Sequence, residues 1–404
     1  MKILIVAGAR PNFMKIGPLM DEINKFPQLQ CILVHTGQHY DNNMSKIFFD
    51  ELGIPRPDIN LDVGSGSHAE QTAEIMKRFE KVCLNQEPTH VLVVGDVNST
   101  IACSLVAVKM GIKVIHVEAG LRSFDRSMPE EINRVLTDAI SDYLFITEKS
   151  AEENLLKEGH SKDKIYFVGN VMIDTLLKHK ERAGCSDILD RLGLLNSECG
   201  NKLNEKKEGN CDNFLEKQIQ YAVLTLHRPS NVDDQETFKE ILEALLEISK
   251  SFPIIFPSHP RTVNRIQEYK FQNYFHFITS DQKVAVNNTR INCIEPLSYL
   301  DFLNLVSKSR LVLTDSGGIQ EETTILGIPC ITIRNNTERP ITVAAGTNSV
   351  VGNKKASILT GFHNAMSDEF QEAAFPPLWD GKAAQRIVEI LLKEYEKTRN
   401  DNKN

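Results

Sequence analysis

The sequence predicts an α/β fold of two domains, each built on a parallel β-sheet with helices on both faces. Short apolar runs rich in strand-forming residues alternate with longer amphipathic stretches along the whole chain, a pattern typical of parallel sheets. About eleven such runs are present, which is more than one open sheet usually holds. The length of 404 residues also suits two domains.

The strand-like runs fall into two groups. They are 2–7, 31–35, 90–94, 113–117, 143–146 and 164–168 in the first half, and 221–226, 253–256, 291–294, 310–313 and 330–333 in the second. Helical spacing is found at 68–83, 98–110, 130–141 and 382–397, and the polar residues beyond 394 are expected to fray.

The boundary between the domains is expected between 170 and 220, and we place the domains at 1–175 and 176–379. Residues 196–213 contain no Val, Ile, Thr or aromatic residue. That composition cannot form a strand, so the segment is predicted to be a solvated polar loop.

Composition excludes several classes of protein. The chain is 41% hydrophobic with a net charge of −8, which argues against global disorder and against a nucleic-acid-binding protein with a basic face. No apolar run approaches the roughly 18 residues of a membrane span. The eight cysteines form no C-x-x-C pair, which fits a reducing, cytoplasmic environment.

The two halves of the sequence echo each other. ARPN at 9–12 and HRPS at 227–230 each follow a first strand, and GDVNST at 95–100 and TDSGGIQ at 314–320 each follow a later one. The echo predicts two Rossmann-like halves. Loops at the carboxyl ends of such strands line the ligand crevice.

A glycine-rich turn after the strand 310–313 predicts an anion site. Ser316, Gly317 and Gly318 open a helical pattern, and glycines with free N–H groups at a helix start favour phosphate. Glu322 lies one turn further and is placed to bind ribose hydroxyls. The structural alternative is a turn with a helix cap.

Three cations accompany this turn. Arg10 and Lys15 lie just past the first strand, and Arg339 lies in TERP near a later strand end. Arg and Lys bind phosphate as a planar fork and as a point charge. Each alone is equally consistent with a solvated surface charge, but together they predict a diphosphate held between the domains.

Acidic residues cluster in the first half. Asp96 and Glu118 follow successive strands and should face the crevice. Glu130 and Glu131 follow a proline at a helix start, with Arg134 one turn on, and only one of the two acids can fully face the site. Acids in a first helical turn also complement the helix dipole, and Asp96 could serve as a cap.

His227 ends the first strand of the second half and is a candidate acid, base or partner of a leaving phosphate. Motifs for other chemistry are weak. The sequence holds no P-loop and no D-x-D pair, and its G-x-G-x-x-A pattern at 64–69 does not follow the first strand. No metal and no nicotinamide cofactor is therefore expected.

Taken together and in order, the motifs resemble the non-hydrolysing UDP-N-acetylglucosamine 2-epimerase family over most of the chain, except 196–213 and the tail. The motifs are GARPNFMK (8–15), HTGQHYDNNM (35–44), GDVNST (95–100), HVEAGLRS (116–123), MPEEINR (128–134), LHRPSNVD (226–233), LTDSGGIQEE (313–322) and TERP (337–340).

The resemblance implies a GT-B fold: two Rossmann-like domains facing a central cleft, with the C-terminal helix 380–397 packing back on the first. It implies interconversion of UDP-N-acetylglucosamine and UDP-N-acetylmannosamine, by anti elimination of UDP and re-addition to a 2-acetamidoglucal, without metal or nicotinamide. It also implies a homodimer with no nucleic-acid or membrane partner. The UDP-N-acetylmannosamine formed is expected to supply the synthesis of surface polysaccharide or glycan.

Roles carried over from the family make Asp96, Glu118 and Glu130 the catalytic carboxylates, with His227 near the departing UDP. The implied substrate- and UDP-binding residues are Arg10, Lys15, Arg134, Phe302 on the uracil side, Ser316, Gly317, Gly318, Glu322 and Arg339.

The sequence departs from the family pattern at a few positions. Asn12 stands where many members have Glu. Asp41 and Glu74 stand where allosterically activated members have Gln and Arg, beside a retained Gln38 and His39, so we predict weak or absent allosteric activation. Other functions stay open: the same chemistry on a UDP-2,3-diacetamido-hexuronate, a hydrolysing relative that releases free N-acetylmannosamine, a GT-B glycosyltransferase, and a non-catalytic sensor of nucleotide sugars.

Overall fold

The structure is a computed structural model, which describes residues 1–37, 49, 51–195, 218–278, 286–367 and 374–401, without the side chains of Arg10, Thr398 and Asp401. The predicted polar loop 196–213 lies outside the described residues, as do Gln38, His39 and Asp41.

The chain divides into two compact units. The first is Met1–His179 with Glu338–Ile341 and Pro376–Asn404, and the second is Lys180–Thr337 with Thr342–Phe375. The division falls within helix α7 (Val171–Ala183), as does the predicted boundary at 175/176. Glu338–Ile341 belongs to the first unit although it lies far along the second half. The domain bounds given from sequence stay a prediction.

The sheet of the first unit has seven parallel strands in the order β3-β2-β1-β4-β5-β6-β7. They are β1 (Lys2–Ala7), β2 (Gln30–His35), β3 (Ile59–Asn60), β4 (His90–Val94), β5 (Lys113–Val117), β6 (Tyr143–Ile146) and β7 (Ile165–Phe167). The interior of β1, β4, β5 and β6 is almost wholly buried and apolar, as expected for strands covered on both faces.

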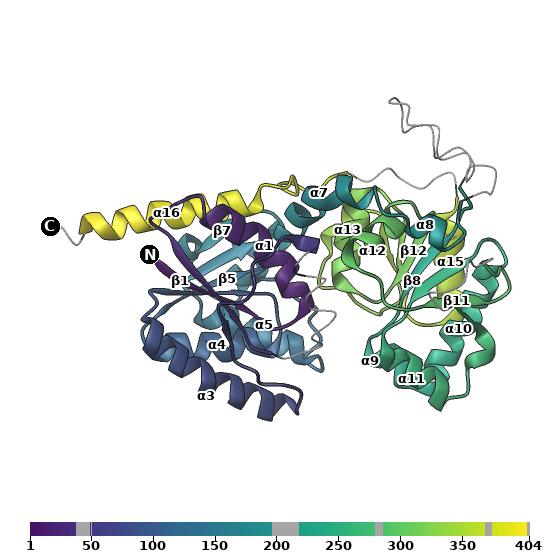
Figure 1. Cartoon of the computed structure of the whole chain (residues 1–404), viewed down its shortest axis with the longest axis horizontal. Coiled ribbons are helices and arrows are strands. Elements are labelled where there is room, and N and C mark those ends of the chain that lie inside the picture. Colours follow the sequence, from purple (N-terminus) through teal and green to yellow (C-terminus); the bar gives the residue numbers. More distant parts are fainter. Residues whose placement is uncertain (38–48, 50, 196–217, 279–285, 368–373, 402–404) are drawn as a thin grey trace. The chain divides into compact units, whose positions relative to one another are not determined.

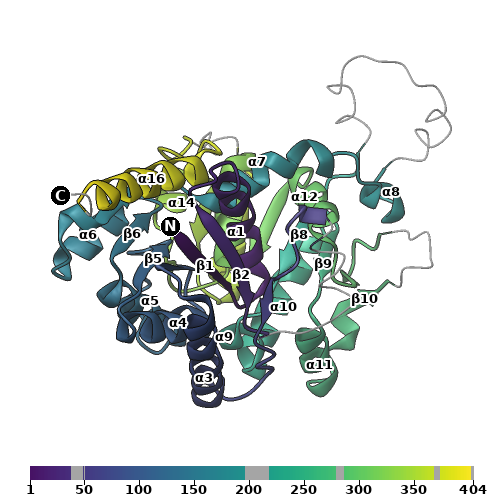
Figure 2. The same cartoon turned by 60° about the vertical axis from the view of Figure 1, so that its left-hand side comes forward.

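Helices cover both faces of this sheet, with α3 and α4 side by side on one and α1 with α16 on the other (Figures 1 and 2). They are α1 (Arg10–Ile23), α3 (His68–Gln86), α4 (Asn98–Lys109), α5 (Pro129–Ile140), α6 (Lys149–Lys157) and α16 (Ala383–Asp401), with the 3₁₀ turn η1 (Lys162–Lys164). The C-terminal helix packs on α1, and its Ile387, Val388 and Leu391 are buried. It extends to Asp401, so the expected fraying beyond 394 is wrong.

The sheet of the second unit also has seven parallel strands, in the order β10-β11-β9-β8-β12-β13-β14. They are β8 (Ala222–Thr225), β9 (Ile254–Pro257), β10 (Phe275–Phe277), β11 (Ile291–Ile294), β12 (Leu311–Thr314), β13 (Cys330–Thr332) and β14 (Asn348–Val350). All eleven strand-like runs of the sequence are found as strands in the two sheets, and β3, β10 and β14 were not predicted.

The second sheet is likewise covered on both faces. One apolar core forms between the strands and α10 with α15, and another between the strands and α8 with α12. The helices are α8 (Ile188–Arg191), α9 (Pro229–Val232), α10 (Gln235–Ser249), α11 (Pro260–Glu268), α12 (Tyr299–Ser307), α13 (Gly317–Leu326), α14 (Ile341–Ala344) and α15 (Lys355–Ala365), with the 3₁₀ turn η4 (Gln272–Tyr274). The α/β prediction is confirmed.

The chain order reverses between β1 and β4 in the first sheet and between β8 and β12 in the second, where β11 also lies between β9 and β10. Ligands of open α/β sheets bind beyond the carboxyl ends of strands at this reversal. The echoed motifs follow these four strands. None of the helices in the described part of the chain is long and apolar enough to cross a membrane.

Candidate functional site

The first unit gathers charged side chains beyond the carboxyl ends of β1, β4 and β5. Asn12, at the start of α1, connects the chain after β1 to the end of β4. Its Oδ1 accepts from the N–H groups of Gly8 and Ala9, and its Nδ2 donates to the Val94 carbonyl at 3.0 Å. A glutamate could not donate that last bond, so the departure from the family pattern has a local use. Arg10 is the first residue of α1.

Glu118 and Lys15 form a buried ion pair. Lys15 Nζ lies 2.5 Å from Glu118 Oε2, and the two side chains are 9% and 2% exposed. The other oxygen, Oε1, is buried and has no hydrogen-bond partner among the described residues. Lys15 was predicted to bind UDP, and the structure places its ammonium on the carboxylate of Glu118.

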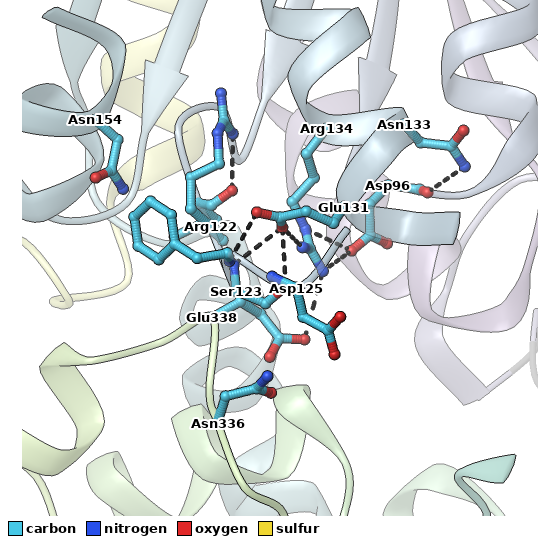
Figure 3. Close-up of polar contacts among 12 residues, drawn as sticks. Asp96, Arg122, Ser123, Asp125, Glu131, Asn133, Arg134, Asn154, Asn336 and Glu338 are labelled. Carbon is cyan, nitrogen blue, oxygen red and sulfur yellow. Dashed lines mark hydrogen bonds and ion pairs between the residues drawn. The ribbon is translucent and has the colours of Figure 1, made fainter. Parts of the chain in front are cut away.

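Asp96 follows β4 and pairs with Arg134 of α5, whose Nε and Nη2 lie 3.0 and 2.8 Å from Asp96 Oδ2. Figure 3 shows the Arg134 guanidinium between the carboxylates of Asp96, Glu131 and Glu338. Burial alone would raise the pKa of Asp96, but the positive charges of Arg134, Lys15 and Arg339 outweigh it and hold that pKa below its usual value. Asp96 is therefore a carboxylate near pH 7.

The two adjacent acids at the start of α5 have different surroundings. Glu131 is buried and accepts from the backbone N–H groups of Ser123 and Phe124 at 2.9 and 2.8 Å, while it also pairs with Arg134. Glu130 is half-buried. The geometry makes Glu131 a support of the 123–124 loop and of Arg134.

Glu338 and Arg339 enter the first unit from the TERP segment. Glu338 Oε1 lies 3.5 Å from Arg134 Nη2 and 3.4 Å from Arg339 Nη1, and both side chains of the segment are buried. Sequence reasoning singled out Arg339 but missed Glu338, because no spacing in the sequence predicts that this segment joins the first unit.

In the second unit, His227 follows β8 and Asp315 follows the neighbouring β12. His227 Nδ1 lies 2.9 Å from Asp315 Oδ1, with the His227 side chain 50% exposed and Asp315 fully buried. Asp315 also accepts from the backbone N–H groups of His227 and Arg228. Burial would raise the pKa of Asp315. The hydrogen bonds from His227, together with the electrostatic interaction with its ring, instead hold that pKa below its usual value.

Asp315 is a functional candidate that sequence reasoning did not name in this role, although it stands at the head of the glycine-rich turn. Asp315 lies beside His227 because β8 pairs with β12, with Thr225 as the partner of Thr314. A sequence argument could have found this contact only by predicting that pairing. The carboxylate fixes the ring of His227 with Nδ1 inward, so that the exposed edge of the ring carries Nε2.

The glycine-rich turn begins α13 as predicted. Ser316 is its N-cap residue, and its side chain makes no capping bond, while Gly317 and Gly318 form the first turn. Burial and the adjacent Glu321 raise the pKa of Glu322 to about 8, against a hydrogen bond from Tyr299 that lowers it. Phe302, on α12, is half-buried against an apolar cluster of this unit.

The predicted site residues therefore fall into two groups. The first unit brings together Lys15, Asp96, Glu118, Arg134 and Arg339, with Arg10 and Glu130 at the starts of α1 and α5. The second unit brings His227 beside Asp315 and sets Ser316, Gly317, Gly318 and Glu322 on one helix, with Phe302 on another.

Comparison with known proteins gives the family. A family model described as UDP-N-acetylglucosamine 2-epimerase matches residues 21–392. A Methanocaldococcus jannaschii protein named UDP-N-acetylglucosamine 2-epimerase is 43% identical over 396 residues, covering 97% of this chain and 99% of that protein. A Pseudomonas aeruginosa protein named UDP-2,3-diacetamido-2,3-dideoxy-D-glucuronate 2-epimerase is 38% identical, covering 97% and 100%.

The same result comes from a solved structure. The crystal structure of Methanocaldococcus jannaschii UDP-GlcNAc 2-epimerase in complex with UDP-GlcNAc and UDP matches with a TM-score of 0.83 and 41% identity, and covers 97% of this chain and 100% of that one. The predicted GT-B class, with its two Rossmann-like units, is confirmed. Since both the family model and relatives of nearly equal length match, the chain belongs to the UDP-N-acetylglucosamine 2-epimerase family, a family of isomerases.

Proposed function

We propose that the protein interconverts UDP-N-acetylglucosamine and UDP-N-acetylmannosamine by anti elimination of UDP and re-addition to a 2-acetamidoglucal. The observation that carries this proposal is Glu118: a buried carboxylate with one oxygen on Lys15 and the other without a hydrogen-bond partner among the described residues. Such an oxygen is available to accept a proton from a substrate.

The chemistry explains why several carboxylates are needed. The hydrogen on carbon 2 is not next to a carbonyl, so its direct removal would be slow. When UDP leaves first, positive charge develops on the sugar ring and the hydrogen becomes acidic. Inversion at carbon 2 then requires a proton to leave one face and another to arrive on the opposite face, so more than one acid–base group takes part.

The first unit supplies these groups. Asp96 stays ionised beside Arg134, so it can stabilise the positive charge on the sugar. Glu118 and Glu130 are the remaining candidates for moving protons, because Glu131 is held by the backbone of the 123–124 loop.

The second unit supplies groups suited to UDP. The free N–H groups at the start of α13, at Gly317 and Gly318, favour the diphosphate. His227, oriented by Asp315, can donate a hydrogen bond from Nε2 to the departing phosphate. Glu322 is proposed to bind the ribose and Phe302 to lie beside the uracil, while Arg10, Lys15, Arg134 and Arg339 supply positive charge around the substrate.

Proton NMR of UDP-N-acetylglucosamine with the protein in D2O, with EDTA and no nicotinamide, tests the reaction. We expect deuterium at carbon 2 together with formation of UDP-N-acetylmannosamine. Unchanged substrate, or formation of the second sugar without deuterium, would contradict the proposed route.

Variants test the assignment of residues. Glu118→Gln and Asp96→Asn should lose most of the turnover, by about 100-fold or more, and still bind UDP through the second unit. Asp142→Asn is a matched control, since Asp142 accepts from the Val114 N–H near the opposite end of β5; it should keep its turnover. Near-normal turnover in both catalytic variants would refute the assignment.

A second candidate substrate is a UDP-2,3-diacetamido-hexuronate, which the 38%-identical Pseudomonas aeruginosa relative favours. The same NMR experiment with this compound separates the two: the better substrate is the one with the higher kcat/KM. We further propose that the product feeds glycan synthesis and that the protein is a homodimer, which sedimentation can test.

A further inference from the structure

Glu118 has a backbone conformation that glutamate rarely adopts. Its φ is +72°, in the left-handed region, directly after the end of β5. A non-glycine residue keeps such a conformation only where its surroundings over-determine it. Part of the restraint comes from β6, because the N–H groups of Glu118 and Ala119 both donate to the Phe145 carbonyl, at 3.0 and 3.1 Å.

The rest of the restraint comes from one buried carboxylate on α5. Asp138 Oδ1 lies 2.6 Å from Nδ1 of His116, two residues before Glu118. Asp138 Oδ2 accepts at 3.0 Å from the N–H of Gly120, two residues after it. Asp138 therefore holds the chain on both sides of the strained residue.

The histidine of this arrangement extends the contact to the neighbouring strand. His116 is fully buried, and its Nε2 lies 2.9 Å from the carbonyl oxygen of Gly95, the residue before Asp96. A carboxylate and a carbonyl are both acceptors, so each ring nitrogen faces an acceptor. The same histidine thus restrains the turns that carry both Asp96 and Glu118.

Two further charges complete the arrangement. Arg122 Nη2 lies 2.7 Å from Asp138 Oδ2, and Arg122 also binds Glu158 through Nε and Nη2 at 2.8 and 2.6 Å. Burial would raise the pKa of Asp138, but His116 and Arg122 lower it, so this fully buried acid stays ionised. Charged groups buried together in this way make a rigid network.

We propose that Asp138 is a positioning residue that clamps the backbone around Glu118 through His116 and Gly120, and so sets the place of the Glu118 carboxylate during the reaction. Asp138 acts through Glu118 and touches no substrate. The effect on turnover rests on the proposed function, whereas the effect on the backbone does not, so the two are tested separately.

The first experiment needs no substrate. Glycine tolerates positive φ and alanine does not, so Glu118→Gly should melt at least about 2 °C above Glu118→Ala in the otherwise native chain. When each is combined with Asp138→Ala, residue 118 is free to relax, and the advantage of Glu118→Gly should vanish or reverse. An unchanged advantage in the Asp138→Ala background would overturn the clamp, whatever the enzyme's substrate.

The second experiment measures kcat and KM for UDP-N-acetylglucosamine. Asp138→Ala should lower kcat about 100-fold with KM changed less than about 3-fold, as expected when a catalytic group is misplaced by about 1 Å. Asp138→Asn should retain most of the activity, because an asparagine can still accept from Gly120 and donate to a neutral His116.

Asp174→Asn is the matched control for loss of a buried, backbone-bonded carboxylate. Asp174 is 7% exposed and accepts from the N–H groups of Ala383 and Ala384 at the start of α16. It should keep its kcat. Equal kcat in Asp138→Ala and the native enzyme, or equal losses in Asp138→Ala and Asp174→Asn, would overturn the positioning role.

A double variant closes the argument. Glu118→Asp already misplaces the carboxylate by one methylene, so adding Asp138→Ala should lower kcat less than about 3-fold further, and a full 100-fold further loss would contradict action through Glu118. If Asp138→Ala does not fold, His116→Asn replaces it in both experiments, because Gly120 and Arg122 then keep their contacts with Asp138. If the native enzyme shows no epimerisation, the proposed function fails and the melting experiment alone decides on the clamp.

Discussion

Removing the ammonium of Lys15 should leave Glu118 as a buried charge without a partner. Lys15→Met keeps the length and apolar stem of the side chain and deletes only the charge. The two groups are 2.5 Å apart and nearly inaccessible to water. Breaking a buried ion pair by removing one partner costs about 3–5 kcal/mol, and no other described side chain is bonded to Glu118.

The free energy of unfolding of Lys15→Met should therefore be about 3–5 kcal/mol below that of the native protein.

Urea unfolding followed by tryptophan fluorescence measures this change. The chain has a single tryptophan, Trp379, which is buried in the first unit and donates from Nε1 to the Thr147 carbonyl. It therefore reports on the unit that holds the ion pair. Adding Glu118→Gln to Lys15→Met should restore most of the loss. A cost of less than about 1 kcal/mol would show that Glu118 does not depend on Lys15.

Three further predictions follow from contacts elsewhere. Asp315→Asn should lower kcat about 10-fold or more, since His227 loses the carboxylate that fixes its ring; a native kcat would contradict this. The pKa of Glu322 is raised to about 8 in the folded state, so stability should fall as the pH rises from about 4.5 to 8. Glu322→Gln should flatten that fall in calorimetry, and equal slopes would refute it. Gly120→Ala should cost about 2 kcal/mol or more, because φ is +76° and the added Cβ would lie 2.6 Å from a backbone oxygen. Gly159→Ala, with φ +89° and no atom within 4 Å, should cost less; equal losses would contradict the steric argument.

The fold was largely predictable because buried parallel strands are continuous apolar runs. The three strands that escaped prediction, β3, β10 and β14, are two or three residues long. All three lie at a sheet edge. Such short strands are defined by hydrogen bonds to a neighbour rather than by their own pattern. The polar tail was misjudged for a related reason, since Glu, Lys and Arg are strong helix formers even without an apolar face.

The site was predictable as far as strand ends determine it. Asp96, His227 and the turn at 316–318 follow strands that flank a reversal of chain order, and Glu118 follows β5, the neighbour of one of these strands. The contacts that divide labour among these residues were not predictable. Helical periodicity predicts that the side chains of Glu130 and Glu131 point in different directions. It does not predict that Glu131 is the one that binds the backbone of the 123–124 loop.

The carboxylates near the candidate site separate into two kinds by their donors. Glu131, Asp138 and Asp315 each accept from at least two donors that include backbone N–H groups. An acid bonded in this way is committed to holding the chain, and a substrate would have to compete with fixed donors for its oxygens.

Asp96 and Glu118 differ from these three. Their carboxylates are bound by cationic side chains, Asp96 by Arg134 and Glu118 by Lys15. A cation holds an acid in its ionised form without filling all of its oxygens, and Glu118 keeps one oxygen without a hydrogen bond among the described residues. This is the electrostatic state that proton removal from a sugar carbon requires. The backbone-bonded acids position the residues that carry out this step. Variants of Asp96 and Glu118 should therefore change the chemical step itself, whereas variants of the backbone-bonded acids should change the placement of the catalytic groups.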